Sequence, residues 1–198
     1  GMNLDIVDDD GNSVREKNGY LVIKSPWPAM TRGLLHDDDR YIKTYWSRFE
    51  NIWFHGDYVF ADSDNLWYMH GRTDDVINVS GHRMSTSEIE HIVISHKKIS
   101  DAASISIPDA ITGEAIVVFF VADKKKYTNL EFEVIEHISK RIGKIAKPKY
   151  VFQLSDLPKT RTGKIMRRLL KTKLMGEELG DLSSLENPEI LKEISKLN

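Results

Sequence analysis

The hydrophobic pattern of the chain changes near residue 75, and this change limits the folds that it can adopt. Before that point apolar residues occur in short runs bounded by turn residues, as in Gly19–Lys24 and Asn51–Asp57, and no segment has a long helical period. Leu66–His70 is a further strand candidate, and Thr44–Phe49 is a short helix candidate. The first part of the chain is therefore predicted to be a small β-rich unit, an open sheet or barrel.

From Asp75 onward, strand patterns alternate with amphipathic helical patterns. The predicted strands are Val76–Val79, Ala103–Ile107, Ile116–Val121 and Tyr150–Leu154. Helices are predicted after capping boxes at Ser85–Glu88 and Thr128–Glu131, after Gly163, and after the pair Asn187–Pro188. This order predicts an α+β domain with a mostly antiparallel sheet and packed helices.

Composition excludes several classes of protein. The 198 residues include no cysteine, which excludes disulfides, thiolate zinc sites and cysteine catalysis. The longest apolar run, Ala115–Ala122, is too short to cross a bilayer, which takes roughly 20 residues, so no membrane partner is expected. No charged-then-apolar leader is visible, and the predicted location is therefore cytoplasmic.

The net charge of −2 hides an uneven distribution of charged residues. Residues 1–74 hold 13 acidic and 8 basic side chains, whereas residues 75–198 hold 17 and 20. Much of the basic excess lies in Lys159–Lys173, which is either a solvated helix face or an anion-binding site. A nucleic-acid partner is disfavoured, because the net charge is negative and the basic stretch lacks interleaved aromatic residues.

Common nucleotide, metal and hydrolase motifs do not fit the chain. Gly163-Lys164 is not a P-loop, because that loop needs a glycine five positions earlier and Ser or Thr after the lysine, where Pro158 and Ile165 stand. The seven histidines are scattered, so no metal site is predicted. No serine lies in a nucleophile-elbow context, and hydrolase chemistry is not predicted.

Two long motifs remain, and they carry a resemblance to a known family. The first is Tyr68–Arg83 followed by Ser87–Glu90, with His55–Asp57 upstream, and the second is Leu157–Arg168. Together they resemble the C-terminal region of the acyl-adenylate-forming enzymes, a superfamily of acyl-CoA synthetases, luciferases and peptide-synthetase adenylation domains. Within that superfamily, the sequences of both motifs look most like those of the acetyl-CoA synthetases.

The resemblance implies two domains and a larger parent protein. Residues 1–73 resemble the β-rich end of the large N-terminal domain, and residues 74–198 resemble the mobile C-terminal domain, with its hinge at Asp74. The glycine-rich phosphate loop, the acyl pocket and the magnesium-coordinating acid of the family do not occur in this sequence. We therefore expect a fragment or a truncated or split gene product that is inactive alone. Its predicted partner is the N-terminal adenylation domain, in cis or as a separate chain.

Lys164 is the predicted catalytic residue. Activation of a carboxylate by ATP builds negative charge on the α-phosphate, and a lysine delivered there stabilises this charge without being consumed. On sequence alone, Lys164 can instead be an exposed lysine at a helix start, where it would face the unfavourable end of the helix dipole. Because acylation would remove the charge, a protein acetyltransferase or deacetylase acting on Lys164 is a further predicted partner.

The resemblance also implies residues for binding the nucleotide. Asp57 would accept hydrogen bonds from the ribose hydroxyls, and Arg72 would contact the ribose and the phosphates. Arg83 would lie near the phosphates in the thioester-forming state. On residue type alone, Asp57 equally suits a turn cap and Arg72 equally suits a surface salt bridge.

Three further residues are implied for CoA. Ser80 and Gly81 match the strand that lines the pantetheine channel, where a residue without a side chain lets the thiol arm pass; a tight turn is the alternative explanation for Gly81. The family's basic contact for the CoA 3′-phosphate falls here on Ser139, with Lys140 and Arg141 beside it, and Arg141 is the candidate.

The predicted function is that of the C-terminal part of an AMP-forming acetyl-CoA synthetase. In the parent enzyme, ATP, acetate and CoA would give acetyl-CoA, AMP and diphosphate through acetyl-adenylate. ATP or AMP and CoA would bind as substrates, and Mg²⁺ would serve the full enzyme without being held by this chain. The alternatives are a propionyl-CoA synthetase and a non-catalytic module that binds CoA or a nucleotide.

Overall fold

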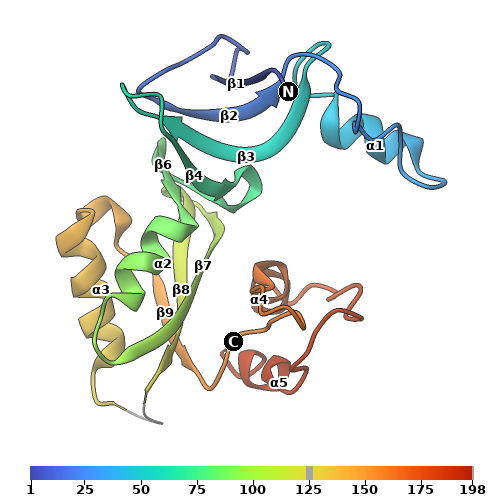
Figure 1. Ribbon diagram of the computed structural model, residues 1–198. Coiled ribbons are helices and arrows are strands. Elements are labelled where there is room, and N and C mark those ends of the chain that lie inside the picture. The colour runs from blue at the N-terminus through green and yellow to red at the C-terminus, as the bar shows by residue number, and fades with distance from the viewer. Residues whose placement is uncertain (124–126, 198) are drawn as a thin grey trace. The chain divides into compact units, whose positions relative to one another are not determined.

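The computed structural model describes residues 1–123 and 127–197, and the chain divides into two compact units, Gly1–Val76 and Ile77–Asn198 (Figure 1). The predicted boundary between residues 73 and 74 refers to the domains of a larger enzyme and stays a prediction. Each unit has its own sheet and its own buried apolar clusters.

The first unit is built on an antiparallel sheet with strand order β1-β2-β3-β4. The strands are β1 (Leu4–Val7), β2 (Asn18–Ile23), β3 (Trp53–Ala61) and β4 (Trp67–Arg72). Apolar residues on both faces of the sheet are buried, and Tyr20 and Val22 pack in a different cluster from Leu21 between them. This agrees with the predicted β-rich unit.

The one helix of the first unit is α1 (Asp38–Tyr45), so the predicted helix over Thr44–Phe49 was wrong. Asp37 caps the helix, because its carboxylate accepts a hydrogen bond from the Arg40 N–H at 3.2 Å. Asp38 and Asp39 lie in its first turn, where the helix dipole favours negative charge. The acidic run that precedes Arg40 was the start signal that the sequence analysis missed.

The second unit contains a five-stranded sheet and helices on both of its faces. Its strands are β5 (Val76–Val79), β6 (His82–Ser85), β7 (Ile99–Asp109), β8 (Gly113–Ala122) and β9 (Tyr150–Leu154). Its helices are α2 (Thr86–Ile94), α3 (Leu130–Arg141), α4 (Arg167–Leu174) and α5 (Ile190–Ile194), with a short 3₁₀ turn at Lys144–Ala146. A further 3₁₀ turn, Thr73–Asp75, lies at the end of the first unit. The strand order is β6-β5-β8-β7, and β9 pairs with β8 in the only parallel ladder among the described residues. The predicted α+β class with a mostly antiparallel sheet is confirmed.

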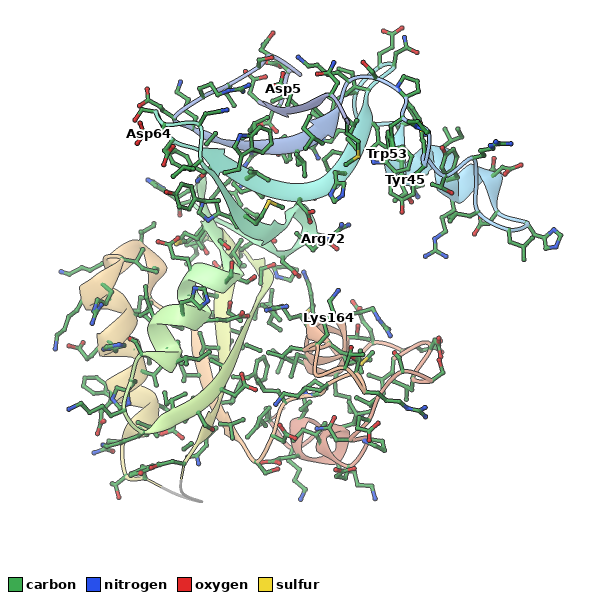
Figure 2. The ribbon with its side chains drawn as sticks, in the orientation of Figure 1. Asp5, Tyr45, Trp53, Asp64, Arg72 and Lys164 are labelled. Atoms are coloured by element: carbon green, nitrogen blue, oxygen red, sulfur yellow. The ribbon has the colours of Figure 1, made fainter. Side chains whose placement is uncertain are left out.

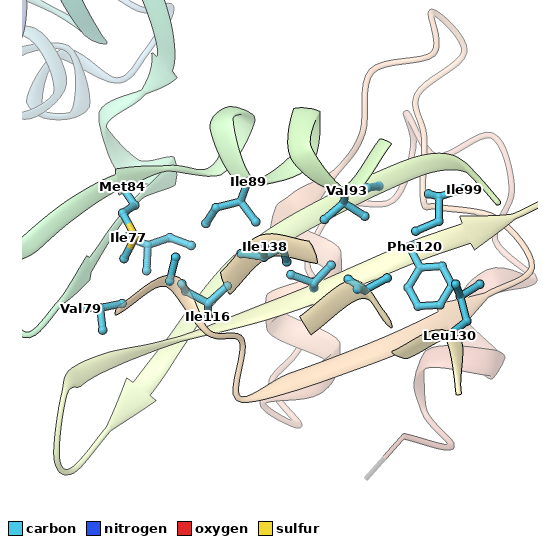
Figure 3. Close-up of a cluster of buried hydrophobic side chains, with 14 residues drawn as sticks. Ile77, Val79, Met84, Ile89, Val93, Ile99, Ile116, Phe120, Leu130 and Ile138 are labelled. Carbon is cyan, nitrogen blue, oxygen red and sulfur yellow. The ribbon is translucent and has the colours of Figure 1, made fainter. Parts of the chain in front are cut away.

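Strand β8 is buried on both faces, which explains its continuous apolar run. Ile116 and Phe120 face the cluster formed with α2 and α3, which Figure 3 shows, whereas Val117 and Phe119 face the cluster formed with α4 and α5. The loop that carries Lys164 follows β9 and precedes α4, so it belongs to the second of these faces.

The two predicted capping boxes did not form. Ser85 precedes α2, but its side chain does not cap the helix and lies 2.6 Å from the hydroxyl of Ser87. Helix α3 begins after Asn129, which has a left-handed φ of 62°, rather than after Thr128. The helices themselves form where predicted because their apolar faces are buried against the sheet.

Candidate functional site

In the first unit, the predicted nucleotide residues form a polar group on β3 and β4. Asp57 and Arg72 lie opposite each other in the antiparallel ladder. One carboxylate oxygen of Asp57 is 2.7 Å from Nδ1 of His55, and the other is 3.6 Å from Nη1 of Arg72. Arg72 also donates from Nη1 to the His55 carbonyl at 3.3 Å, and its side chain is labelled in Figure 2. The carboxylate of Asp57 is mostly buried, with 17% of its side chain exposed, and it lies between the imidazole of His55 and the guanidinium of Arg72.

Gly56 makes this group possible. Its φ is +88°, and a Cβ atom added there would lie 2.6 Å from Nη2 of Arg72. The guanidinium therefore occupies the space that a side chain at Gly56 would fill. Asp74, the predicted hinge residue, lies in the 3₁₀ turn after β4 and is 3.5 Å from Nε of Arg72, with 79% of its side chain exposed.

In the second unit, the predicted CoA residues Ser80 and Gly81 form the turn between β5 and β6. Both have positive φ, 50° and 84°, which is the pattern of a two-residue type I′ hairpin turn. The Ser80 N–H donates to the Thr112 carbonyl at 2.8 Å, which fixes the turn beside the β7–β8 connection. A Cβ at Gly81 would meet no atom within 4 Å, so the face of this glycine is open.

Lys164 lies on a tight hairpin between β9 and α4. Lys159 and Ile165 form an antiparallel bridge, and the Thr160 N–H donates to the Lys164 carbonyl at 2.9 Å. The Lys164 N–H donates to the Thr160 hydroxyl at 3.1 Å, and Gly163 completes the turn with a φ of +80°. Lys164 is exposed, and its ammonium group forms no ion pair with any residue that the structure describes.

The stem of this hairpin carries its own charges. Lys159 lies 2.7 Å from Asp101 and 3.2 Å from Asp156, and the hydrogen bond to Asp101 raises the pKa of Lys159 above its ordinary value. Burial opposes ionisation of Asp156, but its bonds to the Leu157 N–H and to Lys159 hold its pKa below the ordinary value. The charge of Lys159 in the predicted basic stretch is thus paired within the fold, whereas Lys164 has no ion-pair partner among the described residues.

The remaining candidates, Arg83 and Arg141, lie on β6 and at the end of α3. Both are exposed, and Arg141 forms no ion pair within residues 1–123 and 127–197. Burial, and then the charges of His96 and Arg141, lower the pKa of His137 on α3. Among the described residues, no contact joins Arg141 to another candidate residue.

Two contacts were missed by the sequence analysis. His55 was noted only as part of a motif, although its imidazole contacts Asp57. Asn187 was predicted to cap the last helix, but Glu189 precedes α5, and the Asn187 side chain instead contacts Leu157 and Lys159. The sequence held no signal for the second contact, since the partners are about 30 residues apart.

Across the described parts of the chain, no group of three histidine, aspartate or glutamate side chains is placed to hold a metal ion. In the same residues, no helix is long and apolar enough to cross a membrane.

Known proteins show what the chain is similar to. Residues 88–164 match the model of the AMP-binding enzyme C-terminal domain. The chain is 46% identical over 200 residues to the acetyl-coenzyme A synthetase of Pyrobaculum arsenaticum and 41% identical over 201 residues to that of Methanothrix thermoacetophila. These alignments cover 99% and 98% of this chain but 30% of each relative. Among solved structures, acetoacetyl-CoA synthetase from Streptomyces lividans shares the fold, with a TM-score of 0.82 at 24% identity over 99% of this chain and 30% of that one.

Residues 88–164 are therefore an AMP-binding enzyme C-terminal domain. The whole chain is similar to the C-terminal part of acetyl-coenzyme A synthetases and spans about 30% of their length.

Proposed function

We propose that this chain is the C-terminal portion of an AMP-forming acetate–CoA ligase and that Lys164 is its catalytic residue in the adenylation step. The hairpin of Lys164 carries the proposal, because it presents an exposed ammonium group whose charge no described residue neutralises. When acetate attacks the α-phosphate of ATP and diphosphate leaves, negative charge grows on the phosphate oxygens. A cation held ready for that charge lowers the barrier without being consumed.

The His55–Asp57–Arg72 group suits the binding of the nucleotide. The Asp57 carboxylate lies beside a guanidinium and can accept hydrogen bonds from two ribose hydroxyls. Arg72 is half exposed, so it can contact a phosphate while Gly56 leaves room for its guanidinium. We assign Arg83 to the phosphates in the thioester-forming state.

The turn Ser80–Gly81 suits the passage of the CoA thiol arm. The open face of Gly81 lets a flexible chain lie against the backbone, and the two hydrogen-bonded strands hold that backbone in place. Arg141 is the proposed basic contact for a CoA phosphate, since its charge is not compensated by any described residue.

Alternation between the two half-reactions would use Asp74 as its hinge. The exposed 3₁₀ turn of Asp74 lies next to the division between the two compact units, which falls after Val76, and this supports the assignment. The proposed partner is the N-terminal portion found in the relatives, in cis or as a separate chain. Mg²⁺ would be supplied with ATP and held outside this chain, and acylation of Lys164 would switch adenylation off. The proposed location is the cytoplasm.

A chimera tests the proposal. This chain would replace the matching part of the Pyrobaculum arsenaticum acetyl-coenzyme A synthetase, and acetate-dependent exchange between ATP and diphosphate would be measured. We expect exchange in the chimera and at least a roughly hundredfold loss in its Lys164→Ala variant. A folded chimera without exchange, beside an active parent, would refute the proposed function and favour a non-catalytic binding module.

A further inference from the structure

A segment near the C-terminus is bound to the hairpin that carries Lys164. We call this segment, Leu182–Asn187, the strap. Leu185 forms an antiparallel bridge with Thr160, and the Glu186 N–H donates to the Lys159 carbonyl at 2.9 Å. The N-terminal arm of the hairpin therefore lies between the strap and the arm of Lys164, as the middle strand of a small three-stranded arrangement.

The side chain of Asn187 forms three hydrogen bonds with the hairpin arm and the residues just before it. Its Oδ1 accepts a hydrogen bond from the Lys159 N–H at 3.1 Å, and its Nδ2 donates to the Leu157 carbonyl at 2.8 Å. The same Nδ2 donates to Oδ2 of Asp156 at 3.0 Å. Both ends of the side-chain amide are thus engaged by the backbone just before the hairpin, in a partly buried position.

These bonds leave the Lys159 backbone with no freedom to shift alone. Its N–H is bound to the Asn187 side chain and its carbonyl to the Glu186 N–H, while Thr160 next to it binds Lys164. Arg168 at the start of α4 holds the chain that leads into the strap, because it donates to the carbonyls of Leu179 and Asp181. The strap is therefore anchored at both ends to the elements that flank the hairpin.

From this geometry we propose that Asn187 is a positioning residue for Lys164, and that the strap holds the lysine hairpin in the conformation that adenylation requires. The proposal rests on the proposed function of Lys164. The strap lies beyond residues 88–164, the part matched by the family model, so the matched domain alone does not contain it. A hairpin of about seven residues with one glycine turn is marginal by itself, and a third strand with an anchored amide removes that freedom.

Hydrogen exchange in the full 198-residue chain tests the strap without any activity. In Asn187→Ala we expect the amides of Thr160, Lys164 and Met166 to exchange about tenfold faster, since their acceptors all lie within the hairpin. Amides in the β7–β8 ladder should exchange as in the parent. The matched control is Asn78→Ala, which makes the same substitution at an exposed side chain of β5 and keeps the backbone bond from the Asn78 N–H to Glu114.

A second variant separates the two ends of the amide. Asn187→Asp keeps an acceptor for the Lys159 N–H but loses the donor to Leu157 and places a carboxylate beside Asp156. We expect faster hairpin exchange in this variant too, and less so at low pH, where protonation relieves the repulsion. Unchanged hairpin exchange in both variants would overturn the strap. A uniform increase across the second unit would show a purely structural residue and would overturn it as well.

Activity in the chimera then tests the consequence for catalysis. With Asn187→Ala, kcat for ATP–diphosphate exchange should fall about tenfold while the KM for ATP stays unchanged, and Asn78→Ala should match the parent. An Asn187→Ala variant with faster amide exchange in the hairpin but the parent rate of ATP–diphosphate exchange would refute the positioning role. If the chimera with the parent sequence is itself inactive, the proposed function and the positioning role both fail. The hydrogen-exchange rates of the 198-residue chain still decide whether the strap holds the hairpin.

Discussion

The two groups of candidate side chains differ in how their charges are held. In the first unit, Asp57 contacts His55 and Arg72, and every member of the group has a partner within 3.6 Å. In the second unit, the backbone of Lys164 is hydrogen-bonded within a hairpin, and its ammonium group pairs with no residue that the structure describes. A group that holds a ligand in place can be oriented by neighbouring charges, whereas a group that acts on a transient charge loses strength if its own charge is already neutralised. The difference is consistent with the proposed nucleotide-binding role of the first group and the proposed catalytic role of Lys164.

The largest expected effect is the loss of activity on substitution of Lys164. Lys164→Ala in the chimera should lower ATP–diphosphate exchange by roughly two orders of magnitude or more, because its charge is needed only as the transition state forms. The free energy of unfolding should change by less than about 0.5 kcal/mol, since the exposed side chain has no partner among the described residues. Thioester formation from supplied acetyl-adenylate should be nearly unaffected. Equal losses in both half-reactions would contradict the role assigned to Lys164.

The sequence predicted the elements well because their signals are local. Alternating apolar residues and amphipathic periods indicated most strands and the helices of the second unit, and burial against the sheet stabilised them even where a predicted cap did not form. Strand β6 escaped prediction because four residues after a tight turn carry little periodicity. Helix α1 was misplaced because its start depends on Asp37, a single side-chain contact.

The sequence named the candidate site residues but not the contacts that hold them in place. Lys164, Asp57 and Arg72 belong to long motifs, whereas the contact of Asn187 with Leu157 joins segments that neither motif nor period connects. The close approach of the Arg72 guanidinium to Gly56 is likewise a property of the folded sheet. Side-chain contacts between distant segments therefore set the limit of what the sequence could show.

Asp5 provides the opposite extreme from Lys164, a charge fully engaged within the fold. Its carboxylate lies 2.9 Å from Arg15 and 2.5 Å from Lys24, and it also accepts a bond from Ser13. Burial opposes its ionisation, but these partners lower its pKa from 3.8 to about 2. Because the folded-state pKa is below the unfolded one, the stabilisation is present above pH 4 and is lost as the pH falls through 2. It amounts to at most about 2 kcal/mol.

Urea unfolding at pH 7 and pH 3 would measure this effect. All four tryptophans lie before residue 68, so their fluorescence reports on the first unit. We expect the parent to lose stability between the two pH values and Asp5→Asn to start lower and lose less. An Asp5→Asn variant with the same pH dependence as the parent would show that the acid sensitivity comes from other carboxylates.

A pair of glycine substitutions gives the smallest but sharpest contrast between the two units. Gly56 and Gly81 have nearly the same φ, +88° and +84°, so alanine at either position should cost about 1–2 kcal/mol in backbone strain. Their surroundings differ: a Cβ at Gly56 would lie 2.6 Å from Arg72, whereas a Cβ at Gly81 would meet nothing within 4 Å. In the chimera, Gly56→Ala should therefore raise the KM for ATP about tenfold by displacing the guanidinium, and Gly81→Ala should leave that KM unchanged. Tryptophan fluorescence for the first variant and circular dichroism for the second would give the stability losses. If the two variants raised the KM for ATP equally, strain rather than the displaced Arg72 would explain the effect, and the guanidinium would lose its proposed place in the nucleotide site.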